Sequence, residues 1–448
     1  MNLRTGLLLF LLTPIIAFAQ DTARKGPAVH SFSIQQCVDY AAKNNVQAKN
    51  AILALQLQEQ QNKSITAAAL PNLAASGNLT DYLEIPTTLI PGQFFGGAAG
   101  TYIPVKFGTK YNSSGGITLQ QTLFDGQVFV GLQARKTAID YAAKNIELTQ
   151  QTIKANIYKI YYQLVASKTQ LAQLDGDIAF AKDLVHVQNE MYKNGFAEKM
   201  DGDKATVQLV NIETQKHSLM NTVENGYLGL KLLIGMPVKD SIVLTDSVTE
   251  DKIKEGLLNE GTYQYKDRID YQFLSLAKKL DEYNVKRYKL SYFPTLSLMG
   301  AYTESAYRTS FNFLNGQSWF NTSYIGLNLN VPIFSGLAKN ANVKTAELQL
   351  QQQQNQLSDL QNSIDKDVAQ ATDNFYTAVK TLDYQKKNMS LAESVYNESK
   401  KKYEAGTGST LDITSAQTDL ETAQNNYINA MYDAIIAKID YLNATGKL

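Results

Sequence analysis

The sequence predicts a mostly α-helical chain with a small membrane-spanning β portion, built as two copies of one plan. Two observations carry this prediction. Proline breaks helix interiors, and residues 105 to 236 and 333 to 448 contain none, so each half of the chain has room for very long helices. Short segments in which apolar and polar residues alternate lie ahead of the predicted long helices, and such alternation is typical of strands.

The longest predicted helix lies in the second half. Between Gly336 and Gly406 there are 69 residues without proline or glycine, which as a helix would be roughly 100 Å long at 1.5 Å per residue. Apolar residues recur there in steps of three and four, which is coiled-coil spacing, and the pattern resumes after Gly406. The positions are Leu357, Leu360, Ile364, Val368, Ala371, Phe375, Ala378 and Leu382, then Ala416, Leu420, Ala423, Tyr427, Ala430, Ala434, Ala437 and Tyr441.

The two copies are predicted to be structural repeats, each running helix, strand, loop, strand, long helix, glycine turn and helix. Pro71 and Pro294 stand at matching places, each ending a helix where a strand begins. The first repeat is expected at 33–236 and the second at 263–446, joined by a linker at 237–262. The expected strands are about 72–84, 112–124, 295–304 and 323–333.

The strand expected at 323–333 has two different faces. Asn328 and Asn330 share one face, whereas the other carries Ile325, Leu327, Leu329, Val331 and Ile333. Such a strand fits a membrane barrel with a wet lumen, although alternation alone also fits a half-buried strand of a soluble sheet. Export, strands of about ten residues and aromatic-rich loops between them favour the membrane.

Residues 1–19 read as a secretory signal peptide. One arginine precedes an apolar run that is too short to span a bilayer, and Ala17-Phe18-Ala19 suits cleavage. The only cysteine, Cys37, does not follow this segment directly, so neither a lipid anchor there nor an intrachain disulfide is expected. Loss of Arg4 leaves 41 basic against 42 acidic residues, a balance that does not suggest a nucleic-acid partner.

No enzymatic activity is predicted. His30, His186 and His217 are the only histidines, and they lack metal-ligand spacing. No nucleophile elbow, phosphate loop or zinc motif occurs in the sequence. We therefore expect no catalytic residues, no metal and no cofactor.

Gly195 and Gly406 interrupt the long helices at matching points. A tyrosine lies three residues before each glycine and an aspartate six residues after it, giving the pairs Tyr192 and Tyr403, and Asp201 and Asp412. A helix that runs away from the membrane must turn back, and glycine permits that turn. Each glycine is therefore expected at a hairpin tip far from the membrane, with the aspartate about a turn and a half into the next helix.

Four strands cannot close a membrane barrel, because the smallest known barrels need eight. An open edge in lipid would leave backbone groups unsatisfied. The barrel must therefore be shared between identical chains. Two, three or four copies would give eight, twelve or sixteen strands, and the residues alone do not choose among them.

Three stretches resemble one known family. "LPNL" at 70–73, "FPTLSL" at 293–298 and "YEAGTGSTLDITSAQ" at 403–417 are similar to the TolC-like outer-membrane efflux proteins, over essentially the whole mature chain. The resemblance implies a homotrimer whose 12-stranded barrel continues into an α-helical barrel, set in outer-membrane lipid with its helices in the periplasm. It implies an exit duct for small molecules, docked to a periplasmic adaptor and an inner-membrane pump of RND or ABC type.

In that family the tips form the periplasmic gate. Acidic gate residues match Asp201 and Asp412, and a ring of carboxylates in a narrow pore attracts cations and raises its own average proton affinity. This sequence departs from the pattern with Ser415 at a second acidic position and Gly408 in place of a gate arginine.

Simpler roles compete with the gate roles. Asp412 stands at the S-x-x-D spacing of a helix cap after Ser409. For Tyr192 and Tyr403, packing within the tips is the simpler role.

Three other functions remain open from the sequence. The same duct could serve type I protein secretion, since cargo is not readable from the fold. A passive porin would leave the long periplasmic helices without a purpose. An exported coiled-coil adhesin would leave the duplicated strand pairs unexplained.

Overall fold

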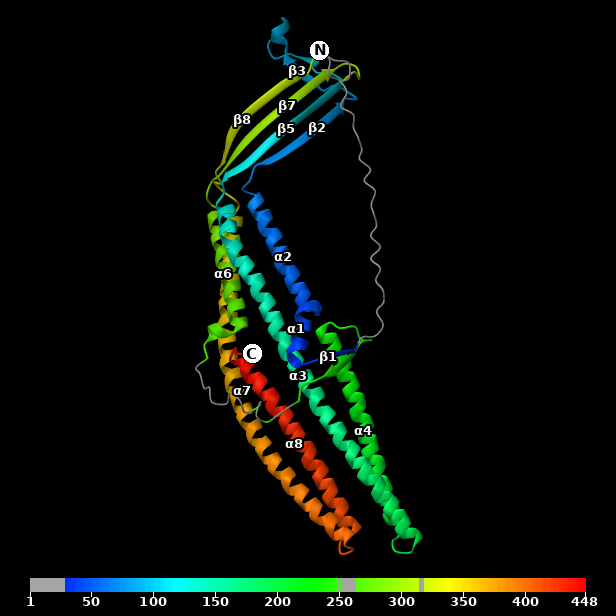
Figure 1. The fold of residues 1–448 in the computed structure, drawn as a ribbon. Coiled ribbons are helices and arrows are strands. Elements are labelled where there is room, and N and C mark those ends of the chain that lie inside the picture. The colour runs from blue at the N-terminus through cyan, green and yellow to red at the C-terminus, as the bar shows by residue number, and fades with distance from the viewer. Residues whose placement is uncertain (1–28, 248–249, 251–252, 254–262, 314–317) are drawn as a thin grey trace, which may run out of the picture.

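A computed structural model describes residues 29–247, 250, 253, 263–313 and 318–448 (Figure 1). The signal peptide expected at 1–19 and half of the linker expected at 237–262 lie outside the described residues. The chain is elongated, with a sheet at one end and two helical hairpin turns at the other (Figure 1). The predicted fold class, mostly helical with a β portion, is confirmed for the single chain.

Two very long helices connect the sheet to the hairpin turns. α3 has 68 residues and α7 has 67, as the absence of proline from their interiors allows. Near the sheet they pack with α2 and α6, and in their far halves with α4 and α8 (Figure 1). The helices are α1 (Ile34–Asn44), α2 (Val46–Ala67), α3 (Gly126–Lys193), α4 (Lys199–Ile234), α6 (Ile269–Leu290), α7 (Ala338–Glu404) and α8 (Thr410–Ala444).

The coiled-coil spacing predicts the buried face of α7 and α8. Ile364 and Leu382 are fully buried on α7 and Ala434 on α8, and the remaining predicted contact positions are buried or half-buried. Each of the larger aliphatic side chains stabilises the helix pair by about 1.5–3 kcal/mol when it is fully buried. Alanines on α8 let the two helices approach closely.

A small parallel sheet lies at the middle of the molecule. β1 (Val29–Phe32) pairs with β6 (Ser241–Leu244), a contact that the sequence did not predict. The fully buried Tyr161 of α3 fastens it, since its hydroxyl donates to the Phe32 carbonyl at 3.1 Å and accepts from the Asp246 amide at 3.1 Å.

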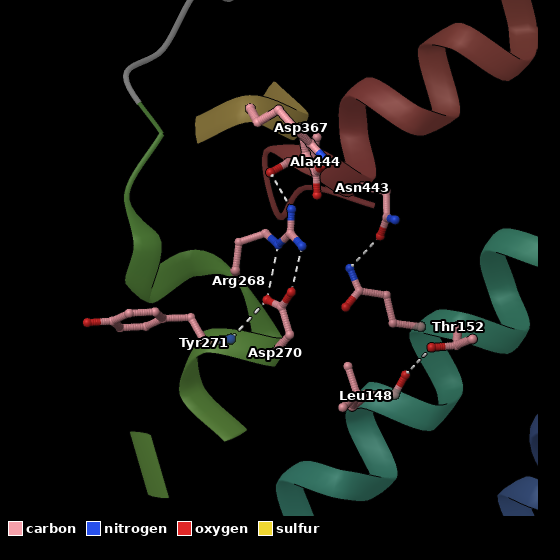
Figure 2. Close-up of polar contacts among 10 residues, drawn as sticks. Leu148, Thr152, Arg268, Asp270, Tyr271, Asp367, Asn443 and Ala444 are labelled. Atoms are coloured by element: carbon pink, nitrogen blue, oxygen red, sulfur yellow. Dashed lines mark hydrogen bonds and ion pairs between the residues drawn. The ribbon is translucent and has the colours of Figure 1, made fainter. Parts of the chain in front are cut away.

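The end of α8 is fastened to the start of α6 at the same level (Figure 2). Arg268 donates through Nη1 to the Ala444 carbonyl at 3.1 Å and through Nε to Asp270 at 3.0 Å. Gly446 has φ 73°, and a Cβ there would lie 2.8 Å from the carbonyl oxygen of Asp267. Glycine is thus needed at this junction for two reasons.

The main sheet joins both halves of the chain. Its order is β2-β5-β7-β8, antiparallel throughout, so β5 of the first half pairs with β7 of the second, and β2 and β8 form its two edges. The strands are β2 (Asn72–Asp81), β5 (Tyr111–Phe124), β7 (Thr295–Arg308) and β8 (Phe320–Asn330).

Several strand expectations differ from the structure, and two of them by three residues at one end: β2 ends at Asp81 rather than at 84, and β8 begins at Phe320 rather than at 323. β8 ends at Asn330 rather than at 333, because Pro332 lacks the N–H that would continue the ladder. β7 continues to Arg308 rather than ending at 304, because it pairs with β5 as far as Tyr111. The segment expected to be a loop at 84–110 holds a hairpin of β3 (Thr87–Pro91) and β4 (Tyr102–Lys106), with a short 3₁₀ helix (Gly92–Phe95) between them.

The register gives the main sheet two unlike faces. Leu73 pairs with Leu119, Leu119 with Gly300, and Gly300 with Ile325, so these residues share one face. Leu73 is 69% and Ile325 76% exposed, and a broad exposed apolar face of this kind marks contact with lipid or protein. The same face carries Asp81, Glu304 and Arg308 only at its end away from the helices. The opposite face carries Asn72, Thr118, Gln120, Ser297 and Asn328, and no charged side chain from any of the four strands.

Candidate functional site at the two hairpin tips

The first tip, residues 190–201, turns α3 into α4. Gly195 has φ 79°, in the left-handed region that other residues enter only with strain. The Gly195 amide donates to the Tyr192 carbonyl at 3.0 Å and the Phe196 amide to the Met191 carbonyl at 2.8 Å. These bonds satisfy carbonyls that the end of a helix leaves free.

The second tip, residues 402–412, turns α7 into α8. Gly406 has φ 72°, and the amides of Thr407 and Gly408 both donate to the Lys402 carbonyl at 2.9 Å. Gly408 is needed for a different reason from Gly406, because a Cβ at 408 would lie 2.9 Å from the Tyr403 nitrogen. The arginine that the family pattern places at this position therefore does not fit this turn.

We expect Gly408→Ala to destabilise the second tip by about 1–3 kcal/mol, the usual range for overpacking. A matched control is Gly176→Ala on α3, where a Cβ would meet nothing within 4 Å and alanine should be neutral or stabilising. Thermal unfolding of the purified protein, followed by circular dichroism, measures both. Equal midpoints for the two variants would contradict the close approach at Gly408.

Asp412 is the third residue of α8 and caps it. The Asp412 amide donates to Ser409 Oγ at 3.1 Å, and the Ser409 amide and hydroxyl donate to Asp412 Oδ2 at 3.3 and 2.7 Å. These hydrogen bonds from Ser409 hold the pKa of the exposed Asp412 below its usual value. The expected position a turn and a half into the helix is wrong, because α8 begins only at Thr410.

Asp201 occupies the matching position in α4 without a matching cap. Its amide donates to the Glu198 carbonyl at 3.1 Å, and the Glu198 side chain makes no capping bond. Among the described residues, its half-buried carboxylate has no hydrogen bond or ion pair. Asp201, too, lies in the first turn of its helix, not a turn and a half into it.

A buried glutamine connects the two tips. Gln188 of α3 is 1% exposed, and its Nε2 donates to the Tyr403 hydroxyl at 3.0 Å and to Thr410 Oγ1 at 2.9 Å. We refer to these three residues as the latch. Tyr192, the counterpart of Tyr403, is 48% exposed and takes no part in it. Sequence reasoning missed Gln188, whose one signal is that it continues the buried spacing of Ala181 and Leu184 on α3.

Five polar contacts follow the line where α3 meets α8, and we refer to this line as the seam. The latch provides the contact nearest the tips. The α3/α4 pair instead has an apolar interior, with Leu174, Ile178 and Ile212 buried in one cluster. Tyr158 and Tyr162 of α3 also pack against the apolar cluster of α7 and α8, so the two hairpins can separate only toward the tips, beyond these two side chains. The contacts are Gln151 to Asn443 at 3.1 Å, Lys159 to Asp440 at 2.8 Å, Gln170 to Asn429 at 2.9 Å, Gln417 to Asp177 at 2.9 Å and Gln188 to Thr410 at 2.9 Å.

The remaining sequence candidates lie elsewhere in the fold. Pro71 and Pro294 directly precede β2 and β7. His30, His186 and His217 lie on β1, α3 and α4. In the described part of the chain, no three side chains of His, Cys, Asp or Glu gather as a metal site would require. Over the same residues, no helix is both apolar enough and long enough to cross a bilayer.

The geometry agrees with that of a known family. A sequence model described as outer membrane efflux protein matches residues 274–447. Over 434 residues, the chain is 21% identical to the outer membrane efflux protein BepC of Brucella suis, covering 95% of this chain and 88% of the relative. It is 22% identical to the outer membrane protein TolC of Vibrio cholerae, covering 75% of this chain and 77% of that one. The second half of this chain is therefore similar to the outer membrane efflux proteins.

A likeness of fold to a solved structure extends over nearly the whole chain. The crystal structure of the outer membrane protein VceC from Vibrio cholerae superposes with a TM-score of 0.74 at 14% identity, covering 92% of this chain and 96% of VceC. The resemblance inferred from the tip and strand motifs is thereby confirmed. The relatives BepC, TolC and VceC are all named as outer membrane proteins.

One further relative is named for a different role. The proteases secretion protein PrtF of Dickeya chrysanthemi is 21% identical over 248 residues, which covers 54% of this chain and 52% of PrtF. The relatives therefore leave the kind of cargo open.

Proposed function

We propose that three copies of this chain form one exit duct across the outer membrane. The observation that carries the proposal is a sheet of four strands with two unpaired edges and one exposed apolar face. Four strands are too few to close in lipid, and each backbone group left unpaired there costs several kcal/mol. Sharing strands with identical chains removes both edges.

The two edges are suited to each other. β2 and β8 run in opposite directions within the sheet, so β8 of one chain can pair antiparallel with β2 of the next. A head-to-tail contact of this kind closes into a ring when the rotation fits. Three chains, the number in the TolC-like family, give a 12-stranded barrel, and the same rotation gathers the helices into a tube below it.

In this role the duct carries cargo from an inner-membrane pump of RND or ABC type and its periplasmic adaptor to the outside. The chain itself has no catalytic activity and needs no cofactor. The tips are the parts farthest from the sheet (Figure 1), and apolar side chains are exposed there, with Phe196 at 79% and Leu411 at 75%. Exposed apolar side chains at one end of a helical protein suit protein contact, here with the adaptor.

We propose small toxic molecules such as drugs as the cargo, which fits the relatives named as efflux proteins. The second candidate is a type I protein-secretion duct, supported by the relative PrtF. Deleting the gene and comparing drug susceptibility with the set of secreted proteins separates the two roles. Unchanged susceptibility together with loss of one secreted protein would favour secretion.

Single-channel recording in planar bilayers tests the duct itself. A gated duct should give a small conductance that grows when the tips are altered. A passive porin would give a large conductance from the start, and a coiled-coil adhesin would give none. Purified protein that is monomeric and soluble without detergent would also contradict the proposal.

We further propose that Asp201 and Asp412 line the narrowest part of the duct and favour cations there. The polar face of the sheet carries no charged side chain, so the barrel adds no charge preference of its own. The combined change Asp201→Ala and Asp412→Ala should therefore lower the cation preference severalfold, measured as the reversal potential in a salt gradient. Asp39→Ala on α1, far from the tips, is the control, and equal potentials for both proteins would contradict the assignment.

A further inference from the structure

Two carboxyl groups face each other inside the seam above the latch. Asp177 of α3 lies eleven residues before Gln188, or about 16 Å farther from the tip. Gln417 of α8 is 4% exposed, and its Nε2 donates to Asp177 Oδ1 at 2.9 Å and to Glu421 Oε1 at 3.3 Å. One amide group thus bridges two carboxyl groups that come from different hairpins.

In the described part of the chain, this pair has no compensating cation. The element that α7 places beside the pair is the Tyr396 ring, which packs edge-on against Phe180 of α3 with the ring centroids 5.8 Å apart. Burial raises the pKa of Tyr396, and the charge of Asp177 raises it further. Toward α4, the nearby lysines are engaged elsewhere, Lys182 with Glu213 at 3.4 Å and Lys216 with Asp175. Among the described residues, no lysine, arginine or histidine forms an ion pair with Asp177 or Glu421.

Two ionised carboxylates at this place repel each other and have lost part of their hydration. Burial raises the pKa of Asp177 to about 6, against the hydrogen bond from Gln417. Burial, and then the charge of Asp177, raise the pKa of Glu421 to about 7. One bound proton removes the repulsion and gives one carboxyl group an O–H to donate.

We propose that Asp177, Gln417 and Glu421 form a proton-operated clasp that holds the two hairpins together in acid and loosens as the periplasm becomes neutral to alkaline. The closed clasp binds protons more tightly than the separated, hydrated groups do. Bound protons therefore stabilise the closed clasp at low pH. This stabilisation is lost as the pH rises from the ordinary pKa range of carboxyl groups through about 7. The clasp itself lies within one chain, and only its effect on the width of the duct rests on the proposed function.

Conductance against pH gives the first test. Between about pH 4 and pH 8 the closed-to-open ratio of the wild-type seam should fall about tenfold for each unit by which the clasp pKa values are raised, so the conductance should rise. The variant Asp177→Asn with Glu421→Gln mimics the protonated clasp and should keep the low conductance throughout. Asp419→Asn, an exposed acid on α8, is the matched control and should keep the rise.

Infrared difference spectra between the same pH values test the clasp without any current. The wild type and Asp419→Asn should show a protonated carboxyl band that disappears as the pH rises, and the double variant should lack it. Identical spectra for the wild type and the double variant would overturn the clasp, whether or not the protein conducts. A carboxyl band that responds as expected, in a protein that never conducts, would instead support the clasp and refute the duct.

Discussion

Gln188→Ala is expected to increase the conductance of the duct severalfold. The substitution removes both hydrogen bonds of the latch, to Tyr403 and to Thr410, and these are the contacts that join the two hairpins at the tips. A hydrogen bond contributes about 1 kcal/mol net, so the loss is about 2 kcal/mol per chain, or about 30-fold in the ratio of joined to separated tips. Planar-bilayer recording at constant pH measures the conductance.

Two further variants make the latch experiment specific. Gln170→Ala removes the seam contact to Asn429 at a more exposed level, and we expect it to change the conductance little. Tyr403→Phe removes one of the two latch bonds and keeps the aromatic ring, so its effect should be intermediate. If Gln188→Ala conducted no better than Gln170→Ala, the latch would not hold the tips together.

The features of the tips that depend on neighbouring residues could be predicted from the sequence. A left-handed residue is needed where a helix turns back, and Gly195 and Gly406 adopt that conformation. The S-x-x-D spacing of Ser409 and Asp412 predicts a capping box, and the structure contains it. Each of these features is determined within about one helical turn of chain.

Contacts between distant segments could not be predicted in this way. Gln188 and Thr410 are 222 residues apart, and only its place in the buried spacing of α3 distinguishes Gln188 from the many other glutamines of the long helices. The hairpin of β3 and β4 was missed because Pro91 and Pro104 argue against strands. They are tolerated because these two strands pair only with each other, so each has one side free of ladder bonds.

Leu327→Lys is expected to abolish assembly in the outer membrane. Leu327 is 66% exposed and lies on the apolar face of β8, an edge strand, paired with Leu298. A lysine on the lipid face of a membrane barrel costs about 2–4 kcal/mol near the bilayer midplane, and a ring of three chains contains it three times. Native electrophoresis of detergent-solubilised outer membranes measures the amount of trimer, which should fall below detection.

The neighbouring residue supplies the control, because successive side chains of a strand point to opposite faces. Asn328→Lys introduces the same charge on the polar face, where Asn328 pairs with Ser297. This variant should assemble, since a water-filled lumen hydrates the ammonium group, and its charge should shift the selectivity toward anions. If both variants assembled equally well, or if only Leu327→Lys did, the apolar face would not be the lipid face, and the barrel derived from it would be wrong.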